Sequence, residues 1–174
     1  MGVHLLLEDA LAWRAALRAA GETLVFTNGH FDLLHVGHLD YLERARALGG
    51  ALFVGINSDA STRRLKGPGR PLVPAVERAR LLAALIPVTA TIIFETDTAT
   101  PLIEALRPEI YVKGGDYAAG ETGEAKPLPE RPFVEAYGGR VILLNYLPGH
   151  STSELIARVQ ALPPAGPLKT DAAQ

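Results

Sequence analysis

The sequence contains no cysteine. This absence excludes disulfide bonds, thiolate metal sites and cysteine nucleophiles. Long apolar runs are missing too: none approaches the roughly 20 residues needed to cross a membrane. The first residues, Met1 to His4, lack the basic and then apolar order of a secretory signal. These absences predict a cytoplasmic protein with no membrane partner.

An excess of positive charge is also missing. Lys and Arg number 17 against 19 Asp and Glu, which gives a net charge of -2, and aromatic residues make up only 6%. Nonspecific nucleic-acid binding requires a basic surface, so we expect no nucleic-acid partner. The hydrophobic share of 48% and the charged share of 21% are typical of a globular protein. A chain of 174 residues suffices for one domain.

Apolar runs alternate with amphipathic segments along the chain. The runs are apolar throughout, which is typical of parallel strands that are covered on both faces. The sequence therefore predicts a single α/β domain of the Rossmann-like type, a parallel five-stranded sheet with helices on both faces. The expected strands are 24–27, 51–56, 91–94, 110–112 and 141–144, and the expected helices are 8–20, 38–48, 74–86, 98–106 (with Thr98 as N-cap), 131–137 and 151–161. We divide the chain into an N-terminal helix (1–22), the main domain (23–161) and a flexible tail (162–174).

The segment from Asn28 to His38 joins the first expected strand to a helix. The free backbone N–H groups of a helix start favour a bound phosphate. His35 and His38 are three residues apart, so they can share one face of the first turn and donate hydrogen bonds to charge developing at an α-phosphorus. Gly37 leaves room for a nucleotide to approach closely. By itself, the pair equally fits ordinary surface histidines or a metal site, although no third ligand is evident.

The full pattern Gly-x-Phe-Asp-x-x-His-x-Gly-His, from Gly29 to His38, resembles the nucleotidyltransferase superfamily of cytidylyltransferases and phosphopantetheine adenylyltransferase. The resemblance covers about residues 24–159, through the segments 54–59, 64–67, 70–72, 77–78, 112–117 and 150–153. Within the superfamily, the segments 57–62, 64–67 and 113–117 are most similar to the adenylyltransferases of D-glycero-β-D-manno-heptose 1-phosphate. These enzymes are often fused behind a sugar kinase of the ribokinase type. No kinase segment is present here, so we expect the stand-alone form.

The resemblance implies a role for each matching residue. It places three residues in catalysis: His35, His38 and Lys66. It assigns nucleotide binding to His30, Phe31, Gly37, His38, Arg78, Lys113, Ser151, Thr152 and Ser153. It assigns acceptor-substrate binding to Asp32, Asn57, Asp59, Asp116 and Tyr117. No residue is assigned to a metal, because Mg²⁺ is expected to be held mainly through the nucleotide phosphates.

Simpler local explanations exist for several of these residues. Ser151 has the position of a helix N-cap, and Asn57 and Asp59 are common turn formers. Lys66 stands before Gly67-Pro68-Gly69, where a solvated charge and a mobile flap over phosphate are both reasonable. Asp32 fits a helix cap as well as a substrate contact. The family often has Thr, Val or Cys in place of His30, which leaves open whether this side chain adds a third imidazole or faces solvent.

The expected reaction is transfer of AMP from ATP to the sugar 1-phosphate, which gives ADP-heptose and pyrophosphate. Homodimers are expected because family members are often dimers. The alternatives are a cytidylyltransferase for glycerol 3-phosphate or a related polyol phosphate, an FAD synthetase, a phosphopantetheine adenylyltransferase, and a non-catalytic nucleotide-binding module. Residues 118–132, with three prolines, depart most from the family pattern. If this segment borders the sugar site, the acceptor need not be a heptose.

Overall fold

The computed structural model describes residues 2–114 and 128–163. Strands and helices alternate along the chain, as the apolar pattern predicts. The strands are β1 Val3–Leu5, β2 Leu24–Gly29, β3 Ala51–Asn57, β4 Ala90–Phe94, β5 Ile110–Gly114 and β6 Arg140–Leu144. The helices are α1 Leu7–Ala19, α2 Val36–Arg46, α3 Asp59–Lys66, α4 Ala75–Ala83, α5 Thr100–Leu106, α6 Arg131–Ala136 and α7 Thr152–Gln160.

The strands form one parallel sheet in the order β1-β4-β3-β2-β5-β6. From β2 the chain continues to one side through β3 and β4, and it then crosses to the other side for β5 and β6. The space beyond the carboxyl ends of β2 and β5 is therefore the topological switch point of the sheet. Ligands of open parallel sheets bind at this place.

The sheet has six strands rather than the five expected from the sequence. The additional strand is β1, which pairs with β4 through Val3 and Ala90 at the edge of the sheet. It has only three residues, and two of them are exposed. Such a short, exposed segment lacks the apolar run by which the five other strands were recognised.

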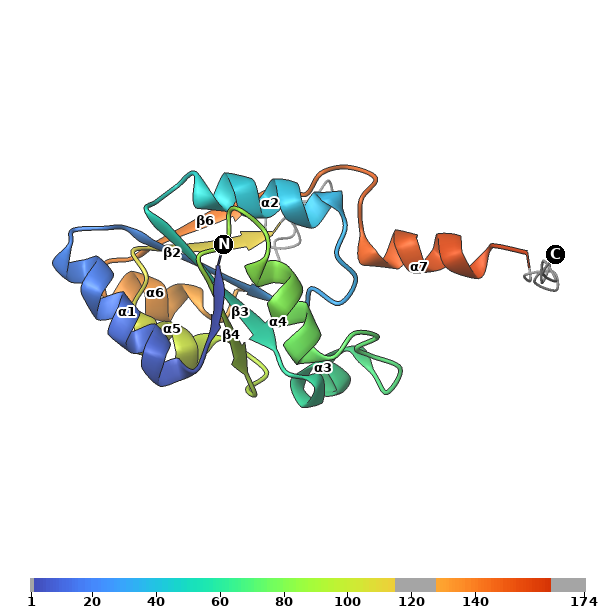
Figure 1. Ribbon diagram of the computed structural model, residues 1–174, viewed down its shortest axis with the longest axis horizontal. Coiled ribbons are helices and arrows are strands. Elements are labelled where there is room, and N and C mark those ends of the chain that lie inside the picture. The colour runs from blue at the N-terminus through green and yellow to red at the C-terminus, as the bar shows by residue number, and fades with distance from the viewer. Residues whose placement is uncertain (1, 115–127, 164–174) are drawn as a thin grey trace, which may run out of the picture.

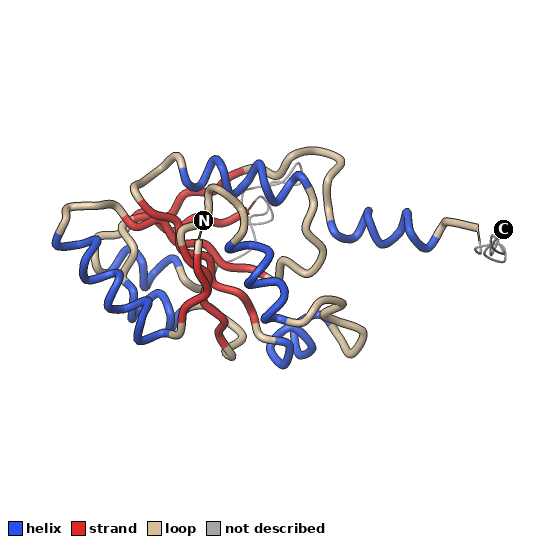
Figure 2. Tube along the Cα trace, in the orientation of Figure 1, coloured by secondary structure: helices blue, strands red, loops and turns tan. Residues whose placement is uncertain are grey.

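Helices cover both faces of the sheet (Figures 1 and 2). On one face, α1, α5 and α6 pack on a core that includes Phe26, Phe53 and Tyr111. On the other face, α2 and α4 pack around residues such as Val25 and Val54. Because side chains on both faces are buried, the strands are apolar without alternation. Helix α7 lies outside these layers: Figure 1 shows it extending beyond the sheet, and none of its residues is buried.

Two local features differ from the sequence predictions. Residues 59–66 form α3, a helix that is absent from the predicted set, and Ser58 caps it by accepting a hydrogen bond from the Ser61 N–H. The helix buries only Ser61 and Thr62, so its sequence carries no apolar stripe. Thr98 is not an N-cap. Helix α5 begins at Thr100, so the N-cap position belongs to Ala99.

The amino edge of the sheet is held together by a buried arginine. Arg14 of α1 donates hydrogen bonds to the carbonyls of Leu106 and Arg107 at the end of α5, and it forms an ion pair with Glu109. The Glu109 carboxylate also accepts a hydrogen bond from the N–H of Leu24 at the start of β2. Arg14 therefore satisfies carbonyl groups at a helix end, where the dipole favours a cation.

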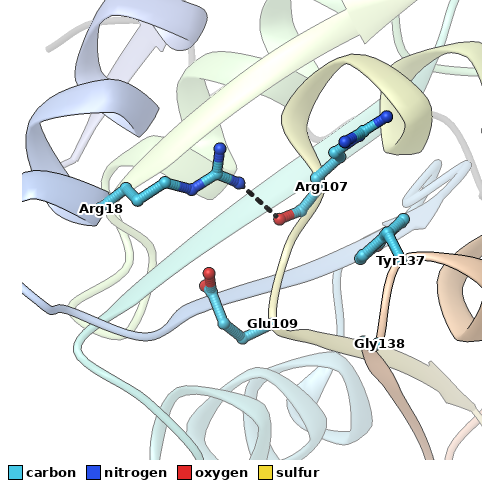
Figure 3. A pocket seen from close by; sticks show the side chains of 6 residues that line it. Arg18, Arg107, Glu109, Tyr137 and Gly138 are labelled. Atoms are coloured by element: carbon cyan, nitrogen blue, oxygen red, sulfur yellow. Dashed lines mark hydrogen bonds between the residues drawn. The ribbon is translucent and has the colours of Figure 1, made fainter.

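A hollow of about 220 Å³ lies beside this arginine and is lined by Arg18, Arg107, Glu109, Tyr137, Gly138 and Gly139 (Figure 3). Arg18 and Tyr137 are turned toward carbonyl groups there: Arg18 donates to the Arg107 carbonyl, and Tyr137 donates to that of Pro108. The hollow stands at the amino edge, whereas ligands of parallel sheets bind beyond the carboxyl ends. We therefore assign it to the packing of α1, α5 and α6.

Replacing Arg14 with Ala should lower the free energy of unfolding by roughly 2–4 kcal/mol, because the Leu106 and Arg107 carbonyls lose their buried donor. Urea unfolding measures the change. The matched control is Arg131→Ala, since Arg131 is half exposed and its ion pair in the described part of the chain is with Glu135, one turn along α6. That control should change the free energy by no more than about 0.5 kcal/mol. Equal effects of the two substitutions would contradict the assigned role of Arg14.

Candidate active site

The loop between β2 and α2 lies at the carboxyl edge of the sheet, beside the switch point. Phe31 has a φ of 48°, the left-handed conformation that is uncommon outside glycine. Its buried ring lies 5.2 Å from the ring of His38, measured between centroids. The unusual backbone at Phe31 turns the chain sharply, and His35 then becomes the N-cap residue of α2.

His35 and His38 lie together, as their spacing predicts. Their rings stack with centroids 3.9 Å apart and an angle of 24° between the planes. Burial, and then the neighbouring His35, lower the pKa of His38 to about 4. Burial, and then His150, lower the pKa of His35 as well. Both imidazoles are therefore neutral near pH 7. The Nδ1 atom of each ring is buried and has no hydrogen-bond partner within the described part of the chain.

His30 stands among cationic side chains. Its pKa falls to about 4, first because of burial and then because of four positive charges, those of Lys66, Arg78, Lys113 and Arg70. Its Nδ1 shares a hydrogen bond with the hydroxyl of Thr62. His30 is thus half buried and neutral, so it does not simply face solvent, and its role as a third imidazole remains a prediction. Cations gathered at one edge of a sheet attract an anion such as a triphosphate.

Arg78 is fully buried, and its guanidinium binds protein groups. It donates to the carbonyls of Val73, His30 and Asn57, and it pairs with the Asp59 carboxylate at 2.8 Å. This side chain ties the β2–α2 loop to the end of β3 and to the segment before α4. A contact between Arg78 and a nucleotide remains a prediction, which requires the guanidinium to exchange partners.

The two acidic residues predicted to bind substrate also have structural partners. Asp32 accepts hydrogen bonds from the N–H groups of Leu72 and Val73 and pairs with Arg70 at 2.6 Å. It thereby holds residues 70–73 against the β2–α2 loop. Asp59 accepts a hydrogen bond from the N–H of Ala75, at the start of α4, in addition to its pair with Arg78.

Asn57 and Lys66 differ in exposure. Asn57 is buried and donates a side-chain hydrogen bond to the Ser61 hydroxyl, which supports its reading as a turn former. Lys66 is the exposed last residue of α3, so it lies on a helix end and not on a loop. Its charge acts on His30. Among the described residues Lys66 forms no ion pair, so its ammonium group is available to an incoming phosphate.

Lys113 at the end of β5 contacts the start of the loop. Its ammonium group donates to the backbone carbonyl of Asn28 at 3.3 Å and to the side-chain Oδ1 of Asn28 at 3.0 Å. The hydroxyl of Tyr111 donates to the same Oδ1. Burial lowers the pKa of Lys113 to about 8, and the charge of Glu130 acts in the opposite direction. These contacts join β5 to β2 across the switch point.

The start of α7 reaches the histidine pair. The start of α7 packs closely on Gly37: a Cβ atom added at Gly37 would lie 3.0 Å from the His150 Cβ, a tight contact that glycine avoids. Ser151 caps α7 by accepting a hydrogen bond from the Glu154 N–H, as predicted. Thr152 and Ser153 lie in the first turn. The free N–H groups of this turn therefore lie on the same side of the molecule as His35.

The structure thus brings most of the predicted site together at one edge. Asp116 and Tyr117 lie outside the described residues, and their roles remain predictions. The sequence missed Asn28, Arg70 and His150. Each of them lies within a recognised segment (28–38, 70–72 or 150–153) but was given no role of its own, because its partners are distant in the chain and no local pattern points to such contacts.

Two kinds of feature are absent from the described ranges 2–114 and 128–163. No group of three or more His, Cys, Asp or Glu residues there could hold a metal ion. No helix there is long and apolar enough to cross a membrane.

A family model described as cytidylyltransferase-like matches residues 26–158. The chain belongs to the cytidylyltransferase-like family. It is accordingly a nucleotidyltransferase, which confirms the relationship suggested by Gly29 to His38. A crystal structure of the lipopolysaccharide core biosynthesis protein from Thermoplasma volcanium has the same fold, with a TM-score of 0.57 at 24% identity. The match covers 73% of this chain and 98% of that one.

Proteins named "Bifunctional protein HldE" are similar to this family member over most of its length. The protein from Syntrophotalea carbinolica is 54% identical over 142 residues, 82% of this chain. The protein from Geobacter sulfurreducens is 51% identical over 146 residues, 83% of this chain. In each case the chain spans only 28% of the relative's own length.

The low pKa of His38 predicts a dependence of stability on pH. An unfolded histidine takes up its proton near pH 6.5, whereas folded His38 does so only near pH 4. The unfolded state therefore binds more protons between these values, and stability should fall as the pH is lowered from about 6.5 to about 4. NMR titration should place the His38 midpoint near 4, and His38→Asn should weaken the pH dependence. A midpoint near 6.5 would contradict the buried, neutral imidazole.

Proposed function

We propose that this nucleotidyltransferase transfers AMP from ATP to a sugar 1-phosphate, D-glycero-β-D-manno-heptose 1-phosphate, and releases ADP-heptose and pyrophosphate. The main support is the stacked pair of neutral imidazoles, His35 and His38, at the switch point of the sheet. The relatives add support for the acceptor. They are bifunctional proteins, and the chain matches only 28% of their length. This share is expected if the chain corresponds to their adenylyltransferase part and the rest includes a kinase.

The reaction is an in-line displacement. An oxygen of the acceptor phosphate attacks the α-phosphorus of ATP, a new P–O bond forms, and the bond to the β-phosphate oxygen breaks, so pyrophosphate leaves with the bonding electrons. The attacking oxygen is already anionic near neutral pH. No strong general base is needed, and catalysis depends on positioning and on stabilisation of charge.

The two imidazoles are suited to this task because they are neutral before the nucleotide binds. Each then donates an N–H hydrogen bond to the α-phosphate without repelling the other ring. Phosphate charge close to the rings raises the pKa of both, which strengthens the donation. Lys66, near His30, is placed to bind the β- and γ-phosphates as a point charge, and the first turn of α7 offers N–H groups to the same phosphates.

Mg²⁺ fits this arrangement as a partner of the nucleotide. Mg²⁺ binds oxygen ligands and commonly keeps several waters, with phosphates as its main other ligands. In the described residues no carboxylate group of three is available as a protein cage. When bound, the ion would neutralise charge on the phosphates. As in many family members, the active form is proposed to be a homodimer.

The main rival is a cytidylyltransferase that uses CTP and glycerol 3-phosphate or a related polyol phosphate. The family description favours this alternative. The histidine pair serves both reactions equally, because it acts on the α-phosphate and not on the base.

Changing His35 or His38 to Asn should lower kcat by at least about 100-fold, because each removes a donor to charge that develops at the α-phosphorus. Pyrophosphate release from ATP measures the effect. The matched control is His4→Asn, since His4 lies on the edge strand β1 and bonds Thr91. That variant should keep its activity. Near-normal turnover in a folded His35 or His38 variant would refute the proposed roles.

A pyrophosphate-release screen tests the substrates. ATP and CTP are each combined with D-glycero-β-D-manno-heptose 1-phosphate, glycerol 3-phosphate, flavin mononucleotide and phosphopantetheine. We expect release with ATP and the heptose phosphate. A clear preference for CTP and glycerol 3-phosphate would establish the rival reaction, and no release with any pair would favour a non-catalytic nucleotide-binding module.

A further inference from the structure

A second polar cluster lies on the opposite face of the sheet from α2 and the histidine pair. It consists of Asn28, Tyr111, Lys113 and Glu130. Asn28 ends β2 and Lys113 ends β5, so the cluster stands at the same switch point. Glu130 directly precedes α6, whose N-terminal end lies at the carboxyl edge of the sheet. Glu130 has no role in the proposed adenylyl transfer.

Glu130 is an unusual residue for this place. It is only 4% exposed, although carboxylates are rarely buried without partners. Its Oε1 accepts a hydrogen bond from the N–H of Ala99 at 3.2 Å. Its Oε2 is also buried, and it has no hydrogen-bond partner within residues 2–114 and 128–163. A buried acceptor without a donor is costly, so its retention calls for an explanation.

The charge of Glu130 is balanced by its surroundings. Lys113 is close enough for the Glu130 charge to act on its pKa, and Lys113 itself donates to Asn28. An ionised carboxylate accepts hydrogen bonds and donates none. Capping of Ala99 requires only one of the two oxygens. Among the described residues no donor reaches the second oxygen, so it can accept a hydrogen bond from a ligand.

We propose that Oε2 of Glu130 accepts hydrogen bonds from a vicinal diol of a substrate at the β2–β5 switch point. This inference rests on the proposed function, in which two molecules carry such diols. One source is the ribose of the nucleotide, and the other is the ring of the acceptor sugar. A carboxylate binds the two hydroxyl groups of a diol well because both can donate to it.

The test substitution is Glu130→Gln. The amide oxygen can still accept the hydrogen bond from Ala99, while an NH₂ donor replaces Oε2, so the fold should persist. The matched control is Glu135→Gln, one turn along α6, where the side chain is 54% exposed and pairs with Arg131. Thermal unfolding of both variants verifies that each is folded.

Binding is measured by calorimetry with ATP, 2′-deoxy-ATP, mannose 1-phosphate and ribose 5-phosphate, and KM is measured for both substrates. We expect Glu130→Gln to weaken binding of the diol ligand by roughly 10- to 100-fold, since a hydrogen bond to a charged group is lost. If the ribose is the source, the variant loses the preference for ATP over 2′-deoxy-ATP. If the acceptor is the source, that preference persists and the KM of the sugar phosphate rises.

The outcomes separate this inference from the proposed reaction. Wild-type protein that binds diol ligands but releases no pyrophosphate with any pair would refute the proposed reaction alone, provided Glu130→Gln still weakens binding. Equal behaviour of Glu130→Gln and wild type with every ligand, including a shared lack of binding, would overturn the inference. Equal effects of Glu130→Gln and Glu135→Gln would also overturn it.

Discussion

The buried guanidinium of Arg78 holds the carboxyl edge of this protein together. It binds the carbonyl of His30 in the loop after β2, the carbonyl of Asn57 at the end of β3, and the carboxylate of Asp59 at the start of α3. The loop after β2 is distant in the sequence from the two other segments, and the one guanidinium joins them. An arginine suits the task because its planar group carries several donors in fixed directions and stays charged when buried. Arg78 thus helps to fix the conformation of the histidine loop, together with the contacts of Asp32 and Lys113.

Opposite electrostatic requirements meet at this edge. The triphosphate calls for positive charge, and Lys66, Arg70, Arg78 and Lys113 all act on His30. The imidazoles must nevertheless stay neutral, because two charged rings stacked at 3.9 Å would repel each other. Burial resolves the conflict by disfavouring protonation of the histidines, while two of the arginines are paired with Asp32 and Asp59. The site is therefore positive toward an incoming anion and neutral at the two rings that, in the proposed reaction, contact the α-phosphate.

The two faces of the sheet carry different polar groups at the switch point. On the face of α2, the histidines and the start of α7 form a region suited to phosphate groups. On the face of α5 and α6, the buried Glu130 and Lys113 form a polar region suited to hydroxyl groups. Asn28 connects them, because its side chain contacts Tyr111 and Lys113 while its backbone leads into the histidine loop. A substrate with both an anionic and a polyhydroxylated part matches this division.

The sequence by itself determined the α/β architecture, five of the six strands and the proximity of His35 and His38. These features are local: an apolar run marks a buried strand, and a three-residue spacing at a helix start brings two side chains to one face. The sequence also determined the family, through the unbroken pattern from Gly29 to His38. Only the tertiary structure decided that β1 joins the sheet and that Glu130 is buried at the switch point. It also decided that Arg78, Asp32 and Asp59 connect the β2–α2 loop, the end of β3 and the segment before α4. Each of these features depends on partners that are distant in the chain, and a pattern of neighbouring residues contains no information about which distant groups the fold brings into contact.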